Sequence, residues 1–297
     1  MQQDQITGYS EKLQIEKRYV TVTTKETLLE MVEAIEEASR ISLDTETTSL
    51  NPRKGKIIGF SITTKIGTGF YLPTLKWNNY TQKLEELLIE GKSTHNIAVR
   101  VMKMLKGKKL ICHNASFDLR YIKNYYGVSL IEDLWVDTAL LVHTVQEEGA
   151  GMGVFGLKPL AVSIQEHIGL NVEEAANKEQ VELKESIKKN GGSTTKDSFE
   201  IYKADMEILS KYAAADTDLT LRICNYFLTK LKEEKLEKFF FEEEVMPLYK
   251  EVTVPMEELG VDLDIPLLEK TREEISIDLE KNRRIVINSI LSTAEAK

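Results

Sequence analysis

Two acidic residues, Asp44 and Glu46, lie two positions apart in the segment ISLDTETTSL at residues 41–50. The apolar residues Ile41 and Leu43 predict a short core strand, and residues two apart on a strand project from the same face. Two adjacent carboxylates repel each other and lose hydration, and a divalent cation between them relieves both effects. The pair is therefore a candidate metal site, although two solvated acids at the start of a loop would have the same sequence.

A third acidic residue, Asp118, lies in HNASFDLRYI at residues 113–122, where a predicted strand is followed by a predicted helix. A carboxylate in the first turn of a helix interacts well with the helix dipole, and this alone could explain its presence. His113 and Asn114 add hydrogen-bonding groups, and Phe117 adds a ring on which a single-stranded base could stack. The segment is a second candidate part of the same site.

A third candidate lies in LSKYAAADTDLTLRICNYF, a predicted helix at residues 209–227. Tyr212 and Asp216 are four residues apart and therefore share one helix face, as a surface pair also would. Asp218 is expected on a different face, as a solvated acid. Elsewhere, Asp137 directly precedes a predicted helix and is expected to be its N-cap.

Charge limits the classes of partner. The chain of 297 residues contains 39 basic and 48 acidic side chains, a formal net charge of −9. Proteins that bind nucleic acid through its backbone are usually basic, so any such contact here must be local or mediated by metal ions. The segment RVMKMLKGKK at residues 100–109 has five basic residues and no acid. It could contact a DNA backbone or form a solvated helix face.

Cysteine content and hydropathy indicate an intracellular protein. Cys112 and Cys224 are the two cysteines, too few for a disulfide framework and without zinc-site spacing. The first residues, MQQDQITGYS, lack the apolar core of a signal peptide, and no apolar run approaches about 18 residues. We therefore expect a cytoplasmic location without a membrane span.

Hydrophobic spacing predicts a mixed α/β organisation. Thr23 and Glu26 have the spacing of a capping box at the start of the first helix. Residues 41–73 predict an antiparallel meander, and the later alternation of strands and helices predicts a mixed sheet. Predicted strands are 19–23, 41–46, 56–64, 68–73 and 108–114, and predicted helices are 25–40, 95–107, 115–127, 137–146, 157–169 and 209–227.

Four segments fit this pattern less well. Residues 1–18 are expected to form a flexible arm, and residues 74–94 are not assigned. The segment GAGMGVFG at residues 149–156 contains the spacing GxGxxG, but a predicted helix precedes it instead of a strand, so we expect a mobile loop and no dinucleotide site. Residues 171–203 are charged and poor in apolar residues, and we expect an insertion or flexible loop.

The three acidic segments together resemble a known family. DTET on the first core strand, N-x-x-F-D at a strand–helix junction and Y-x-x-x-D on a late helix resemble DEDD-type 3′–5′ exonucleases of the tyrosine subtype. YAAADTDLTL, DTALLVHTV and LKPLA are most similar to the proofreading domain of family A DNA polymerases, which are DNA polymerase I-like. Residues 239–270 resemble the helical lead-in to the polymerase domain. The resemblance covers roughly residues 20–170 and 204–290.

The resemblance implies a fold and a division into domains. The fold would be α/β, a ribonuclease H-like mixed β-sheet flanked by helices, with a C-terminal helical extension. The exonuclease domain would cover residues 19–235, with 171–203 as an insertion or loop. Residues 236–297 would be a helical segment like the start of a family A polymerase domain.

The resemblance also implies an activity and its residues. Two divalent ions, Mg²⁺ or Mn²⁺, roughly 4 Å apart would clamp the attacking and leaving oxygens of an in-line displacement. Asp44, Glu46 and Asp216 would hold one ion, and Asp44 and Asp118 the other. Tyr212 is too weak an acid, with a pKa of about 10 for the free group, to be a general base. It would instead orient the attacking water, with help from Glu46.

The implied substrate is the 3′ end of single-stranded or frayed DNA, from which 5′-nucleoside monophosphates would be released. The residues that would contact its last nucleotides are Thr45, Leu50, His113, Asn114 and Phe117.

Three alternatives stay open at this point. A ribonuclease D-like enzyme would share the acidic residues but act on RNA. A non-catalytic scaffold domain would have lost carboxylates, and none is missing here. The chain could also bind a polymerase through residues 239–297, either within one polypeptide or as a separate subunit.

Overall fold

A six-stranded sheet forms the centre of the computed structural model, which describes residues 17–146, 155–168, 172–195 and 198–295. Its strand order is β1-β4-β3-β2-β9-β10. The strands β2, β3 and β4 form the predicted antiparallel meander, whereas β1 pairs with β4, β9 with β2 and β10 with β9 in parallel. The sheet strands are β1 (Arg18–Thr21), β2 (Arg40–Thr47), β3 (Ile57–Thr63), β4 (Thr68–Pro73), β9 (Lys109–Cys112) and β10 (Leu134–Asp137).

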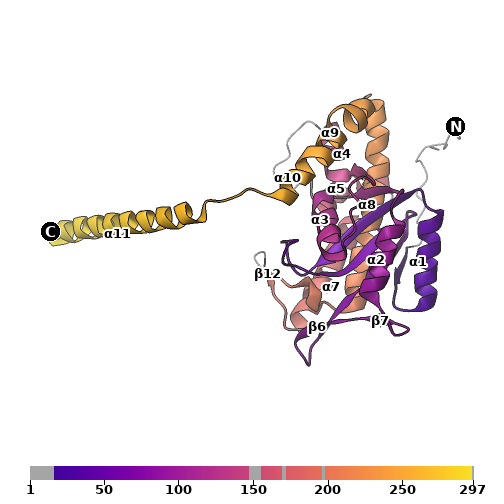
Figure 1. Cartoon of the computed structure of the whole chain (residues 1–297), viewed down its shortest axis with the longest axis horizontal. Helices are drawn as coiled ribbons and strands as arrows, with labels where there is room; N and C mark the ends of the chain where they lie inside the picture. Colours follow the sequence, from indigo (N-terminus) through magenta and orange to yellow (C-terminus); the bar gives the residue numbers. More distant parts are fainter. Residues whose placement is uncertain (1–16, 147–154, 169–171, 196–197, 296–297) are drawn as a thin grey trace. The chain divides into compact units, whose positions relative to one another are not determined.

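Helices between residues 25 and 233 flank the sheet (Figure 1). The helix α4 begins after Asp137, whose side chain accepts a hydrogen bond of 2.9 Å from the Ala139 N–H, so the predicted N-cap is confirmed. The helices are α1 (Lys25–Glu37), α2 (Thr94–Met104), α3 (Ala115–Tyr126), α4 (Thr138–Val145), α5 (Leu157–Ser163), α6 (Gln165–Ile168), α7 (Val172–Lys189), α8 (Met206–Glu233), α9 (Val245–Leu248), α10 (Val254–Leu259) and α11 (Ile265–Glu295).

The helix α8 packs across β1, β2, β3 and β4 and carries the third acidic motif to the sheet. Small residues permit this close approach. A Cβ atom at Gly69 of β4 would lie 2.9 Å from the Cβ atom of Ala214, inside van der Waals contact. The glycine therefore sets the distance between the sheet and the helix.

Two segments form more secondary structure than the sequence predicts. Residues 171–203, expected to be an insertion or flexible loop, contain α7, the hairpin β11 (Thr194–Thr195) with β12 (Ser198–Phe199), and a 3₁₀ turn. The helix α7 has few apolar residues, but Leu183 and Ile187 are buried beside α8. Residues 74–94 form two short hairpins, of which the first pairs β5 (Leu75–Asn78) with β6 (Lys83–Glu86) and the second pairs β7 (Leu88–Ile89) with β8 (Lys92–Ser93).

The capping box of α1 also differs from its prediction. The N-cap is Thr24, and the hydroxyl and backbone bonds of the capping box join it to Thr27 instead of joining Thr23 to Glu26. The helix begins at Lys25, as predicted, so Thr24 and not Thr23 is the residue directly before it. Residues 1–16 of the predicted flexible arm at 1–18, and residues 149–154 of the predicted glycine-rich loop at 149–156, lie outside the described residues. Arg18, at the end of the predicted arm, begins β1.

The structure divides into two compact units, Met1–Val254 and Pro255–Lys297. Residues 239–254, which include the π-helical turns Phe239–Glu243 and Tyr249–Thr253, belong to the first unit. They bury Phe240 and Met246, and Phe241 stacks on Trp135 of β10. The predicted domain boundary lies between residues 235 and 236, whereas the boundary between the two compact units lies between Val254 and Pro255. Throughout the described ranges, every helix is too short or too polar to cross a membrane.

Candidate active site

The strand β2 carries the first two carboxylates into a buried site. Glu46 is buried and Asp44 is half-buried. Burial raises the pKa of Asp44 well above its ordinary range, and the nearby charge of Asp118 raises it further. Burial and the charge of Asp216 raise the pKa of Glu46 to about 8. Because the charges of Asp118 and Asp216 act on both carboxyls of β2, the four acidic side chains lie close together in a site of low dielectric.

Asp118 of α3 is bound to the sheet by two hydrogen bonds. Its Oδ1 accepts a bond of 2.8 Å from the backbone N–H of Thr45 and one of 2.6 Å from the Thr45 hydroxyl. The side chain is 2% exposed, and burial raises its pKa to about 7 despite these bonds. The Thr45 side chain projects from the opposite face of β2 to those of Asp44 and Glu46. Thr45 therefore holds Asp118 at the edge of the acidic site.

The first turn of α3 is capped from other elements. Asn114 has a left-handed backbone, with φ of 64°, and its side chain makes no capping bond. The carboxylate of Asp137 instead accepts bonds from the N–H groups of Asn114 (3.1 Å) and Ala115 (2.7 Å). Tyr249 accepts a bond of 2.9 Å from the Ser116 N–H and donates one of 3.0 Å to Asp137. The sequence predicted only a local N-cap for Asp137 and no role for Tyr249.

The helix α8 supplies Tyr212 and Asp216, which face the carboxylates of β2. Burial and the charges of Asp216 and Glu46 raise the pKa of Tyr212 far above its ordinary value. The ammonium of Lys158, from α5, lies 3.3 Å from Asp216 Oδ1 and 3.4 Å from the centroid of the Tyr212 ring. The sequence analysis missed this lysine, although it lies within the quoted segment LKPLA.

The donor set fits a divalent cation. Four carboxylates supply the oxygen ligands that Mg²⁺ and Mn²⁺ prefer. Asp216 Oδ1 is buried and makes no well-formed hydrogen bond within the described residues, and such an atom is rare unless an ion or water binds it. As the side chains stand, no three acidic, histidine or cysteine residues of the described ranges are arranged to hold an ion. The ammonium of Lys158 occupies space beside one of the expected ligands.

The residues expected to contact nucleotides differ in exposure. Leu50 is 86% exposed, and Asn114 is also exposed. His113 is half-buried, with its Nδ1 2.8 Å from the Thr138 hydroxyl oxygen. Phe117 is also half-buried and packs against the core. Their contact with a nucleotide, like that of the buried Thr45 described above, stays a prediction.

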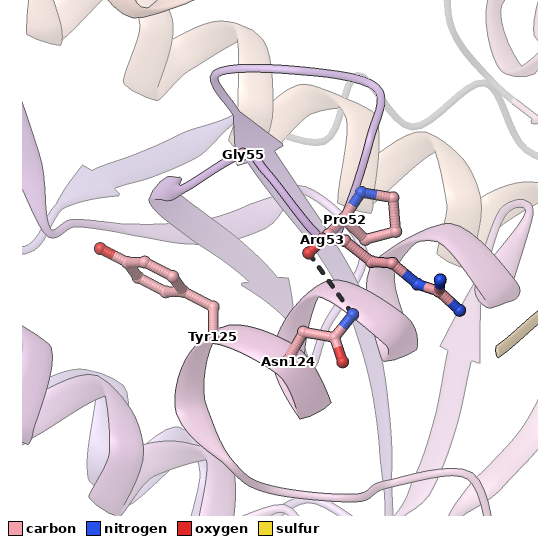
Figure 2. A pocket seen from close by; sticks show the side chains of 5 residues that line it. All are labelled: Pro52, Arg53, Gly55, Asn124 and Tyr125. Atoms are coloured by element: carbon pink, nitrogen blue, oxygen red, sulfur yellow. Dashed lines mark hydrogen bonds between the residues drawn. The ribbon is translucent and has the colours of Figure 1, made fainter. Parts of the chain in front are cut away.

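The loop that carries Leu50 is fastened to α3 and borders a pocket. Tyr121 donates a hydrogen bond of 3.1 Å to the Asn51 carbonyl, and Asn124 donates one of 3.4 Å to the Pro52 carbonyl. A Cβ atom at position 55 would overlap the Tyr121 hydroxyl, so the loop requires Gly55 there. Figure 2 shows the pocket and the Asn124 bond, with lining residues Pro52, Arg53, Gly55, Asn124 and Tyr125.

The basic segment at residues 100–109 is partly engaged within the protein. Lys108 donates hydrogen bonds of 2.9 and 2.8 Å to the carbonyls of Glu36 and Ala38, at the C-terminal end of α1. The ammonium of Lys109 lies 4.9 Å from the centroid of a Trp135 ring. These two side chains therefore have structural roles.

The expectation that Asp218 is a solvated acid is wrong. Its side chain is fully buried and accepts hydrogen bonds from Tyr19 Oη (3.0 Å), the Gly67 N–H (2.8 Å) and Arg222 Nε (3.2 Å). The helix spacing correctly separated it from Asp216, but β1 and the turn before β4 cover the face that was expected to be solvated. Paired and hydrogen-bonded, the buried charge is tolerated as part of the core.

Comparison with known proteins identifies relatives of the chain. Residues 19–232 match the profile of a family described as 3′–5′ exonuclease. DNA polymerase I of Borreliella burgdorferi is 30% identical over 276 residues, which cover 92% of this chain and 26% of that protein. The DNA polymerase of Escherichia phage T5 is 25% identical over 256 residues, which cover 82% of this chain and 26% of that protein. The chain thus spans about a quarter of the length of these relatives.

Solved structures share the fold. The POL domain of Pol1 from M. smegmatis, in complex with DNA primer-template and dNTP, has a TM-score of 0.54 at 14% identity, with 88% of this chain and 35% of that chain covered. Escherichia coli RNase D, an exoribonuclease, has a TM-score of 0.52 at 15% identity, with 82% and 52% covered. The predicted ribonuclease H-like fold is confirmed.

Proposed function

Because the chain belongs to the family of 3′–5′ exonuclease domains related to DNA polymerase I, we propose that it removes nucleotides from the 3′ end of single-stranded or frayed DNA. Each cycle would hydrolyse the terminal phosphodiester and release a 5′-nucleoside monophosphate. The observation that carries the proposal is the convergence of four buried or half-buried carboxylates from β2, α3 and α8 on one site, where the charges of Asp118 and Asp216 raise the pKa values of Asp44 and Glu46. Such a site needs cations.

The four carboxylates would hold two divalent ions. Asp44, Glu46 and Asp216 would bind one, and Asp44 and Asp118 the other. When bound, the ions would supply the positive charge that the attacking and leaving oxygens of an in-line displacement require. The unbonded oxygen of Asp216 supports this assignment, since it is available to a ligand.

Tyr212 would position the attacking water. Its raised pKa keeps the side chain a neutral phenol at physiological pH, so it can donate a hydrogen bond but cannot act as a general base. Glu46 lies close enough to influence the same phenol electrostatically and would help to orient the water.

The proposal is tested by incubating the chain with single-stranded DNA labelled at either end, with Mg²⁺ and with EDTA. We expect 5′-labelled DNA to shorten stepwise, 3′-labelled DNA to release labelled mononucleotide at once, and both reactions to stop in EDTA. Degradation that starts at the 5′ end, or that continues in EDTA, would contradict the proposal.

A second candidate is ribonuclease D-like cleavage of RNA, which the fold shared with RNase D favours. Parallel assays on RNA of the same sequence distinguish the two candidates. We expect faster cleavage of DNA, because the related sequences are those of DNA polymerases. On the same ground, we propose that the chain acts with a polymerase module, in the same or a separate polypeptide.

A further inference from the structure

Lys158 lies at the carboxylate site, and the proposed function gives it no role. Its ammonium lies 3.3 Å from Asp216 Oδ1, and the two side chains are 17% and 12% exposed. The same ammonium lies 3.4 Å from the centroid of the Tyr212 ring. The negative face of an aromatic ring and a buried carboxylate both attract a cation. The Asp216 carboxylate and the Tyr212 ring therefore both attract the ammonium of Lys158.

The contact between Lys158 and Asp216 is a charge contact without a hydrogen bond. Among the described residues, neither Lys158 Nζ nor Asp216 Oδ1 has a hydrogen-bond partner of good geometry, although the two atoms are within ion-pair distance. A lysine built to remain in a buried pair normally directs its three donors at acceptors. The missing bonds indicate that the ammonium is held by charge and that it can be displaced.

The charge of Lys158 acts on three of the four carboxylates. It lowers the pKa values of Asp44, Glu46 and Asp216, which burial raises. The protein thus carries an internal cation among the residues that we assign as metal ligands. The flexible four-carbon stem of lysine allows the ammonium to leave without a change in the backbone.

We propose that Lys158 is the resident counter-ion of the metal-free site, and that its ammonium leaves Asp216 Oδ1 when a divalent cation binds. The inference rests on the proposed function only in its assignment of the metal ligands. It makes Lys158 a positioning residue, which stabilises the metal-free protein and weakens its apparent affinity for metal ions.

The test compares Lys158→Met with wild type in Mn²⁺ binding, followed at pH 8 by the electron paramagnetic resonance signal of free Mn²⁺. We expect Lys158→Met to bind Mn²⁺ about tenfold more tightly or more, because a unit charge a few ångströms from the ion is removed. In EDTA the variant should melt at a lower temperature than wild type, and Mn²⁺ should raise its melting temperature by more. Lys158→Arg, which keeps the charge, should bind Mn²⁺ within a few-fold of wild type.

Lys211→Met is the matched control, since Lys211 is exposed on α8 and the change in net charge is the same. It should leave Mn²⁺ affinity unchanged. Equal or weaker Mn²⁺ binding by Lys158→Met would overturn the inference, as would an equal gain in affinity for Lys211→Met.

A measurement on wild type keeps the inference testable if Lys158→Met does not fold. Acetylation of individual lysines is followed by mass spectrometry with and without Mn²⁺. We expect Lys158 to react faster with Mn²⁺ because its ammonium has left Asp216, and an unchanged or slower rate would overturn the inference. Wild type that binds Mn²⁺ but fails to cleave DNA would refute the proposed function alone. Wild type that cleaves DNA while Lys158→Met binds Mn²⁺ no more tightly would refute this inference alone.

Discussion

The two ends of the carboxylate site are held by different forces. At one end, Asp118 accepts two hydrogen bonds from Thr45, and the first turn of its helix is fixed by Asp137 and Tyr249. At the other end, Asp216 Oδ1 is buried without a well-formed hydrogen bond in the described part of the chain, and the ammonium of Lys158 lies beside it. The first end is fixed by directional bonds and the second by charge.

This difference separates two ways of positioning a ligand. Hydrogen bonds fix an oxygen in place whether or not an ion is bound, and such preorganisation lowers the cost of forming the reactive geometry. A charge contact fixes neither the angle nor the partner, so one cation can replace another. We therefore expect metal binding to rearrange the Asp216 end more than the Asp118 end.

Asp44→Ala removes a ligand from both ends of the site, because Asp44 is assigned to both ions. We expect loss of metal binding and a decrease in cleavage on the order of a thousandfold or more, since metal ions contribute several kcal/mol to such reactions. Calorimetric metal titration and single-turnover cleavage measure the two effects. A variant that still cleaves within tenfold of the wild-type rate would remove Asp44 from the metal site.

Tyr212→Phe tests the Asp216 end without removing a metal ligand. One lost hydrogen bond from the phenol is worth about 1.5–3 kcal/mol, which corresponds to a roughly 10- to 150-fold slower step. Metal affinity should stay at the wild-type value. Single-turnover cleavage at saturating Mg²⁺ is the measurement. Cleavage at the wild-type rate would show that Tyr212 does not position the water.

Tyr249→Phe tests the support of the Asp118 end. The change leaves the buried Ser116 N–H without its acceptor and removes a bond to Asp137, so we expect the free energy of unfolding to fall by about 1–3 kcal/mol. Urea denaturation measures the free energy of unfolding. Tyr80→Phe is the control, because Tyr80 is 98% exposed. Equal stability of the two variants would mean that Tyr249 does not anchor α3.

The smallest expected effect is a pH dependence of the metal-free protein. Folding raises the pKa of Glu46 to about 8 and that of Asp118 to about 7, so the folded state binds these protons more tightly than the unfolded state. The stability gained from this protonation is complete below the unfolded pKa values, near 4, and is lost as the pH rises toward 8. In EDTA, the melting temperature should therefore fall by a few degrees between pH 6 and pH 8.5.

Glu46→Gln isolates the contribution of one carboxyl to that pH dependence. The variant should show a smaller decrease over the same range, because its amide does not titrate. Thermal melts of both proteins in EDTA, in the same series of buffers, provide the measurement. If the two melting temperatures fall in parallel, Glu46 does not contribute to the pH dependence.

Sequence reasoning worked best where a residue's role depends on its near neighbours. The meander at residues 41–73 follows from apolar runs separated by a turn, and the N-cap at Asp137 follows from one side chain before a helix. It worked less well where partners are distant in sequence. The charged segment at residues 171–203 is predicted to be an insertion or loop, because its few apolar residues pack against segments distant in sequence, including β3, β4 and α8.

The sequence by itself determined the family and the fold, because the acidic motifs, their order and the spacing of apolar residues are all local. The tertiary structure decided which acids are buried together and what surrounds them. Asp216 and Asp218 are two residues apart, yet one faces the carboxylates of β2 and the other is enclosed by Tyr19 and Arg222. Likewise, Lys158 reaches Asp216 across 58 residues of sequence. Charge and burial act through space, so contacts between distant segments set the electrostatics of this site.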